Sequence, residues 1–284
     1  MFTEQMFWEI GTERTGRMST DEFRNYYLGF VFYSYLSKRM IKFADSILKA
    51  DGIKYQGVDE KTVKGKEYLE TVKAAARSEL GYFLKPSELF DTIAKRCDVS
   101  KRKGERLFFL EELASILKNI EQSTKGTKAE SDFENLFEDL DLTSRKFGRT
   151  ENARNQLISS VLSSLAIVTG NPKDGDWFRK NYKFWPDNYQ SLIGRYTSVA
   201  EKKVTEFYTP SDTGEILAKI ITTGKTKLRS IYDPACGTAS LLLRAAREVS
   251  EIGMFYGQEF NRQNYNVARM HMILNGVPYE KFDI

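Results

Sequence analysis

The chain has 284 residues, of which 41% are hydrophobic, 29% charged and 13% aromatic, and its formal net charge at pH 7 is +4. This composition excludes a disordered, collagenous or membrane-spanning protein, and the length predicts two domains with separate cores. The nearly balanced charge permits nucleic-acid binding without requiring it. The sequence has no long apolar run and no signal-peptide pattern at Met1, and Cys97 and Cys236 do not make a disulfide framework. We therefore expect a cytoplasmic protein without membrane contact.

Residues 1–168 are predicted to form an all-helical domain, because apolar residues recur there at three- and four-residue spacing. Ser19 and Glu22 have the spacing of a capping box, which opens a long helix with an aromatic stripe on one face. Such a stripe fills a core or contacts a partner, and the buried interpretation is favoured. Further helices are expected over residues 68–80, from about 90, and over 105–122, 131–140 and 152–168.

Turn-forming residues follow this helical region, and residues 169–190 are predicted to be a linker. Residues 191–284 then alternate between helix and strand. A helix is expected to begin with Thr209 as N-cap and Pro210 at its first position. Four apolar residues are expected on its buried side: Ile216, Leu217, Ile220 and Ile221.

Strands are predicted over residues 229–232, 254–257 and 281–284, and helices from 240 to 249 and from 263 to 275. The second of these helices is expected to stop at Gly276. This order of strands and helices predicts a parallel, doubly wound sheet with right-handed crossovers.

The turn after the first strand carries the chemistry that points to a ligand. Gly237 lets the backbone approach a ligand closely, and Thr238, Ala239 and Ser240 are small enough not to block it. Glu259 ends the next strand about twenty residues later, where a carboxylate accepts both hydroxyls of a ribose. The pattern therefore indicates a cofactor that contains a nucleoside.

Three such cofactors compete for this site. The glycine fingerprint of dinucleotide sites and the Gly-Lys-Ser/Thr of triphosphate sites are both absent from the sequence. Asp233, beside the turn, would repel a pyrophosphate and attract a cation. S-adenosylmethionine carries an ammonium and a sulfonium, so it is the favoured cofactor.

The same residues carry a family resemblance. Residues 206–210 (Glu-Phe-Tyr-Thr-Pro), 233–243 (from Asp-Pro-Ala-Cys-Gly to Leu243), 256–259 and 265–270 resemble the modification (M) subunit of type I restriction-modification systems. Their order is that of the gamma class of amino-methyltransferases. Residues 21–37, 81–90 and 136–148 also resemble the helical N-terminal domain of that subunit.

The resemblance implies methylation of the exocyclic N6 amino group of adenine in double-stranded DNA, with S-adenosylmethionine as cofactor. It implies a complex with a DNA specificity (S) subunit, a second M subunit and a restriction (R) motor-nuclease subunit. The fold it implies is an all-helical domain followed by the N-terminal part of a Rossmann-like methyltransferase domain. By position, the cofactor-binding residues would be Glu206, Phe207, Tyr208, Thr209, Pro210, Ser211, Asp233, Gly237, Thr238, Ala239, Ser240 and Glu259.

Two departures from the family pattern bear on activity. The family turn often reads Gly-Ser-Gly-Ser, and Ala239 replaces its second glycine, so we expect a tighter loop with binding intact. The Asn-Pro-Pro-aromatic motif that grips the flipped adenine is absent from these residues, and Asn171-Pro172 reads as a linker turn. We therefore expect no catalytic residue here, no methyl transfer by these residues alone, and a fragment or a domain completed by a partner.

An alternative function is a truncated or decoy M subunit that binds specificity subunits without methylating. Two other residues have ordinary interpretations. Cys236 is expected to be a small buried residue of the turn rather than a nucleophile. His271, the only histidine, is expected to be a packed or exposed helix residue rather than a base or metal ligand, and no metal site is predicted.

Overall fold

The computed structural model describes residues 8–10, 18–97, 110–170, 184–199 and 209–284. The chain divides into two compact units, one of Met1–Ser19 and Gly29–Tyr182 and the other of Thr20–Leu28 and Lys183–Ile284. Among the described helices, none is both long and apolar enough to cross a membrane. We call the first of the two compact units the helical unit and the second the α/β unit.

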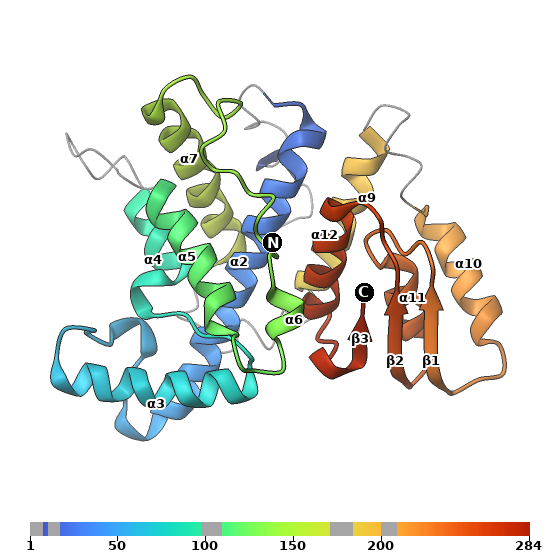
Figure 1. Ribbon diagram of the computed structural model, residues 1–284, viewed down its shortest axis with the longest axis horizontal. Helices are drawn as coiled ribbons and strands as arrows, with labels where there is room; N and C mark the ends of the chain where they lie inside the picture. The colour runs from blue at the N-terminus through green and yellow to red at the C-terminus, as the bar shows by residue number, and fades with distance from the viewer. Residues whose placement is uncertain (1–7, 11–17, 98–109, 171–183, 200–208) are drawn as a thin grey trace. The chain divides into compact units, whose positions relative to one another are not determined.

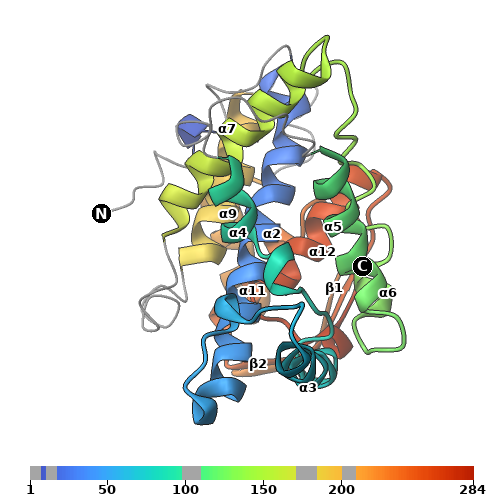
Figure 2. The ribbon, with the colours of Figure 1, turned by 90° about the vertical axis from the view of Figure 1, so that its left-hand side faces the viewer.

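The helical unit is built around the long helix α2, Thr20–Ile47, whose residues from Gly29 onward belong to this unit. The helices α4, α5 and α7 lie around α2 (Figures 1 and 2). The α-helices of this unit after α2 are α3 Val63–Glu79, α4 Phe90–Cys97, α5 Leu110–Ser123, α6 Glu130–Phe133 and α7 Glu151–Thr169. Short 3-10 turns lie at Leu48–Asp51, Tyr55–Gly57 and Pro86–Glu88.

The aromatic stripe of α2 is buried, as the sequence predicts. Phe23, Tyr27 and Phe30 of this stripe are fully buried, and Tyr26 is half-buried. A buried tyrosine usually finds an acceptor for its hydroxyl group, and Tyr33 Oη of α2 donates to the Glu88 carbonyl at 2.5 Å. Tyr82 Oη donates to the Leu36 carbonyl at 2.9 Å, and Tyr55 Oη donates to a carbonyl at 2.6 Å. The stripe therefore fills a core.

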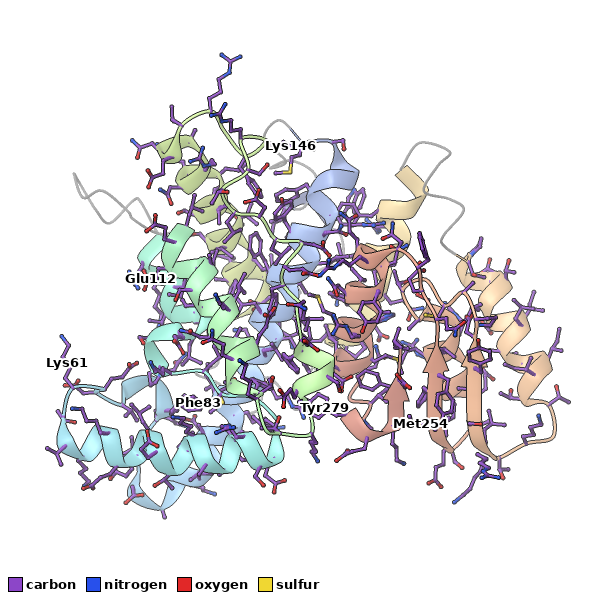
Figure 3. The ribbon with its side chains drawn as sticks, viewed as in Figure 1. Lys61, Phe83, Glu112, Lys146, Met254 and Tyr279 are labelled. Atoms are coloured by element: carbon purple, nitrogen blue, oxygen red, sulfur yellow. The ribbon has the colours of Figure 1, made fainter. Side chains whose placement is uncertain are left out.

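Charged pairs link the helices inside this unit. The buried Lys38 ammonium lies 3.2 Å from both carboxylate oxygens of Asp91 and also donates to the carbonyl of Gly170. The Arg96 guanidinium of α4 donates to both oxygens of Glu112 on α5, at 2.6 and 2.7 Å. Figure 3 labels Glu112, which lies on the α5 side of this fork.

The α/β unit contains a three-stranded parallel sheet in the order β1-β2-β3. Its helices are α9 Phe184–Val199, α10 Ser211–Thr222, α11 Ser240–Glu248 and α12 Arg262–Leu274. Its strands are β1 Lys227–Asp233, β2 Glu251–Gly257 and β3 Phe282–Asp283, the last preceded by a 3-10 turn at Tyr279–Lys281. The prediction of a helical region followed by a parallel α/β sheet is confirmed.

The ends of α12 match the residue types at those positions. The side chain of Asn261 accepts the amide of Asn264 at 3.1 Å, which caps the start of the helix. The helix ends at Leu274 with Asn275 as C-cap, and Gly276 follows at a φ of +74°. Because glycine adopts this left-handed conformation without strain, the predicted stop at Gly276 is confirmed.

The predicted buried face of α10 is wrong. Ile216 is 60% exposed and Ile220 64% exposed, and Leu217 and Ile221 are exposed as well. The helix packs on α11 through its small residues instead, since a Cβ at Gly214 would lie 3.3 Å from a methyl group of Leu241. Helical spacing identifies an apolar face, but it does not say what covers that face.

Three other elements differ from the sequence prediction. The helix expected over residues 131–140 is the short α6, and the chain then turns, with Asn135 at a φ of +53°. α10 begins at Ser211, with Pro210 rather than Thr209 as N-cap. Helix α9 was not predicted, and it begins inside the segment interpreted as a linker. The domain boundaries themselves stay a prediction.

Candidate cofactor site

Backbone hydrogen bonds join the segments that follow β1 and β2. Asp233 and Gly257 are register partners at the carboxyl ends of the two strands. The amide of Gln258 donates to the Asp233 carbonyl at 2.9 Å, and the amide of Cys236 donates to the Gln258 carbonyl at 2.9 Å. The turn after β1 and the segment after β2 therefore form one connected edge, where ligands bind in sheets of this kind.

The turn from residue 234 to 239, which we call the β1–α11 turn, has two residues with positive φ. Gly237 has a φ of +56° and Ala239 a φ of +62°. The Ala239 amide donates to the Cys236 carbonyl at 2.8 Å, which closes the turn. Within the described part of the chain no side chain caps α11 at Ala239, so the first-turn amides of this helix keep their capacity to bind a ligand.

Close packing explains Gly257 at the end of β2. A Cβ at this position would lie 2.9 Å from the Cys236 sulfur and 2.7 Å from a methyl group of Ile284. Burial, together with the charges of Asp233 and Glu259, raises the pKa of the Cys236 thiol to about 12. The thiol is therefore protonated at neutral pH, and Cys236 acts as a small buried residue, as the sequence predicts.

A cavity of about 590 Å³ opens at this edge, and we call it the strand-end cavity. It is lined by a residue just before α10, by the β1–α11 turn and its flanks, and by the segment after β2: Thr209, Asp233, Pro234, Ala235, Cys236, Gly237, Thr238, Ser240, Leu241, Gln258, Glu259 and Phe260. This described lining has two carboxylates and no lysine or arginine. Its charge favours a cationic ligand over a phosphate.

Backbone amides fix both carboxylates. Asp233 Oδ1 accepts the amide of Ala235 at 3.0 Å, and Glu259 Oε1 accepts the amide of Asn261 at 2.6 Å. The hydroxyl groups of Thr238 and Ser240 lie 3.0 Å apart beside them. The polar groups of the cavity are therefore held in place before any ligand arrives.

Six of the residues predicted to bind the cofactor line this cavity together: Thr209, Asp233, Gly237, Thr238, Ser240 and Glu259. Pro210 and Ala239 adjoin lining residues without lining the cavity, and Ala239 is fully buried. Glu206, Phe207 and Tyr208 lie outside the described residues, as does the side chain of Ser211. The binding roles of all twelve stay predictions.

Six of the described lining residues were not among the predicted cofactor-binding residues: Pro234, Ala235, Cys236, Leu241, Gln258 and Phe260. Gln258 and Phe260 are the two of these that lie outside the β1–α11 turn and α11. Gln258 accepts a hydrogen bond from Tyr232 Oη at 3.0 Å, and the Phe260 side chain is fully exposed beside Glu259. The signal available in the sequence was their position, since both flank the acidic residue that ends the second strand. A single aromatic residue in a loop otherwise has no periodic pattern.

Comparison with known proteins gives a family match for the C-terminal part of the chain and similarity to known subunits over nearly all of it. The model of the N-6 DNA Methylase family matches residues 181–284. The chain is 32% identical, over 99% of its length, to the type I restriction enzyme MpnII methylase subunit of Mycoplasma pneumoniae. It is also 28% identical, over 31% of its length, to the MjaIX methylase subunit of Methanocaldococcus jannaschii.

A solved structure shows the same architecture. The type I restriction-modification system methyltransferase subunit from Streptococcus thermophilus aligns with 98% of this chain, at a TM-score of 0.77 and 29% identity. The chain covers 56% of that subunit and 51% of the MpnII subunit, so it spans about half the length of these relatives. Over nearly its whole length the chain is similar to type I restriction-modification methylase subunits, and its residues 181–284 match the N-6 DNA Methylase family.

Proposed function

We propose that the chain binds S-adenosylmethionine in the strand-end cavity and contributes this site to an adenine-specific N6 DNA methyltransferase. The observation that carries the proposal is the combination of Asp233 and Glu259 with a turn of small residues at the ends of two parallel strands. The cavity volume of about 590 Å³ lies in the range of roughly 300–1,000 Å³ that small-molecule sites have.

The chemistry of the lining suits this cofactor better than a phosphate-bearing one. Asp233 would hold the ammonium of the methionine part, and Glu259 would accept the ribose hydroxyls. Phe260 would contact the flat face of the adenine, because it offers an exposed ring beside Glu259. The predicted segment from Glu206 to Ser211 would wrap the methionine and adenine side.

The division of labour in the reaction follows from these residues. S-adenosylmethionine, when bound, supplies a methyl group on a sulfonium sulfur for attack by the adenine amino nitrogen. The turn residues and Glu259 would orient the cofactor, and alignment matters more than acid-base help in such a transfer. We propose that the residues gripping the flipped adenine lie outside these 284 residues, because the sequence has no Asn-Pro-Pro-aromatic motif.

The proposed partners are those that the family resemblance implies. They are a DNA specificity subunit, a second methylase subunit, a motor-nuclease subunit and double-stranded DNA. With a net charge of only +4, the chain offers little electrostatic attraction for DNA by itself. We therefore assign reading of the DNA target to the specificity subunit.

Calorimetric titration tests the cofactor part of this proposal. S-adenosylmethionine is expected to bind the 284-residue chain with one site, and ATP and NAD are expected not to bind, because the described lining offers carboxylates and no cationic side chain. Saturable binding of ATP or NAD without binding of S-adenosylmethionine would refute the assignment.

A second measurement separates the proposed enzyme from the alternative function, a truncated or decoy M subunit that binds specificity subunits without methylating. We call this alternative the interaction module. With a specificity subunit and target DNA, the 284-residue chain is expected to incorporate no tritiated methyl group. Incorporation is expected once a polypeptide with the adenine-gripping motif is added. If the chain binds the specificity subunit but the completed complex never methylates, the interaction module is the correct function.

A further inference from the structure

His271, the only histidine of the sequence, contacts the backbone of the β1–α11 turn. His271 is on α12, is fully buried, and places Nδ1 2.9 Å from the carbonyl oxygen of Thr238. Thr238 and His271 are 33 residues apart in sequence. A side chain outside the cavity therefore touches the backbone of the turn that lines the cavity.

The direction of this hydrogen bond follows from its partner. A carbonyl oxygen only accepts, so Nδ1 of His271 carries the proton and donates it. Nε2 has no hydrogen-bond partner among the described residues. The ring packs near the Tyr189 ring of α9, with centroids 5.7 Å apart, and the Tyr189 hydroxyl contacts Met270 Sδ at 3.5 Å. Packing therefore fixes the imidazole with its donor toward the turn.

The peptide group between Thr238 and Ala239 is held at both ends. Its carbonyl accepts from His271, and its N–H donates to the Cys236 carbonyl at 2.8 Å. Turning this peptide plane over would bring Ala239 from its φ of +62° toward a negative φ, which an alanine prefers. The two hydrogen bonds therefore oppose a relaxation that the alanine itself favours.

This restraint has a specific use at Ala239. A glycine would adopt the left-handed conformation without a Cβ penalty, whereas an alanine is strained in it. A hydrogen bond from a buried donor contributes an energy of the same order as this strain. The imidazole is thus matched in magnitude to the strain that it opposes.

We propose that His271 is the positioning residue of the β1–α11 turn, and that its Nδ1–H bond keeps the turn in the conformation that receives the cofactor. The cofactor part rests on the proposed function. The conformational part concerns the turn alone and stands without it.

The test compares three variants of the full chain. His271→Leu removes the donor and keeps a side chain of similar reach. His271→Asn keeps an amide nitrogen at the same number of bonds from the backbone as Nδ1. Tyr189→Phe is the matched control, because it removes a weak hydrogen bond from the same packed layer without touching the turn.

Hydrogen exchange of the Ala239 amide is the first readout, and it needs no cofactor. Protection is expected in the parent, in His271→Asn and in Tyr189→Phe, and is expected to fall at least tenfold in His271→Leu. Calorimetric titration with S-adenosylmethionine is the second readout. Affinity is expected to fall at least tenfold in His271→Leu and to recover to within threefold of the parent in His271→Asn.

Each alternative result has a distinct meaning. Unchanged Ala239 protection in His271→Leu would overturn the inference, whatever the cofactor affinity. Equal loss in His271→Asn and His271→Leu, or a similar loss in Tyr189→Phe, would mean that His271 only fills space, and would also overturn it. If the parent itself binds no S-adenosylmethionine while exchange follows the expected order, the proposed function fails and the positioning role of His271 stands.

Discussion

The variant Glu259→Gln tests the proposed ribose contact without disturbing the local fold. Glu259 Oε1 accepts the Asn261 amide at 2.6 Å, next to the first turn of α12. A glutamine carbonyl oxygen accepts the same bond, so the segment after β2 keeps its conformation. The second carboxylate oxygen accepts no hydrogen bond within the described part of the chain, and this is the oxygen that the substitution replaces.

The size of the effect follows from the change in acceptor. Hydrogen bonds to a charged acceptor contribute about 1.5–3 kcal/mol each, and neutral ones about 0.5–1.5 kcal/mol. Glutamine has no charge and presents an NH₂ group where the second oxygen was. We expect a loss of about 1.5–3 kcal/mol over the two ribose hydroxyls, which is a roughly 10- to 150-fold weaker Kd.

Calorimetric titration with S-adenosylmethionine measures this change. Glu248→Gln is the matched control, because Glu248 is an exposed residue of α11 that does not line the cavity. The control is expected to bind like the parent. Equal affinity of Glu259→Gln and the parent would show that Glu259 does not hold the ribose.

Three further predictions concern neighbouring features. Phe260→Ala is expected to leave the melting temperature unchanged, because the side chain is fully exposed, and to weaken S-adenosylmethionine about fivefold or more through lost stacking; titration and thermal melting check both parts. Ile220→Lys is expected to change the free energy of unfolding by less than about 0.5 kcal/mol, whereas Ala218→Lys, at a buried position of the same helix, should cost more than about 2 kcal/mol in urea unfolding. Burial lowers the pKa of His271 to about 4, assisted by the charge of Arg247, so the folded chain binds this proton more weakly than the unfolded chain. The free energy of unfolding should therefore fall as pH falls from about 6.5 to about 4, by up to about 3 kcal/mol from this group. Urea unfolding of the parent and of His271→Asn at pH 7 and pH 4.5 isolates the contribution of His271 to this pH dependence, because the other titratable groups are the same in the two proteins.

The cofactor turn was predictable from the sequence because its requirements are local. Gly237, the small residues after it, and the acidic residue at the end of the next strand follow from how a strand passes into a helix. Parallel pairing of β1 and β2 then brings Asp233 and Gly257 into register. The residues that follow the two strands therefore lie at the same edge of the sheet. The prediction that these residues share one edge therefore needed only the order of strands and helices.

The wrong predictions concern the burial of a helix face and the length of a helix, which depend on tertiary contacts. Ile216 and Ile220 have the spacing of a buried stripe, yet α10 packs through Gly214 and Ala218. The expected helix from residue 131 to 140 has the right periodicity, but tertiary packing replaces most of it by turns around Asn135. In both cases the apolar spacing is that of a helix. Whether the apolar face is buried, and how far the helix extends, depends on tertiary contacts that the spacing does not predict.

Helix α9 shows how a segment interpreted as a linker supports the site. Its buried residues Trp185, Tyr189 and Tyr196 recur at helical spacing, which was the signal available in the sequence. Tyr189 packs on His271, and His271 holds the Thr238 carbonyl of the β1–α11 turn. The α/β unit also includes Thr20–Leu28 from the start of α2. The support of the turn therefore begins upstream of residue 191, so a cut at the predicted boundary would remove part of the structure that holds the cofactor site.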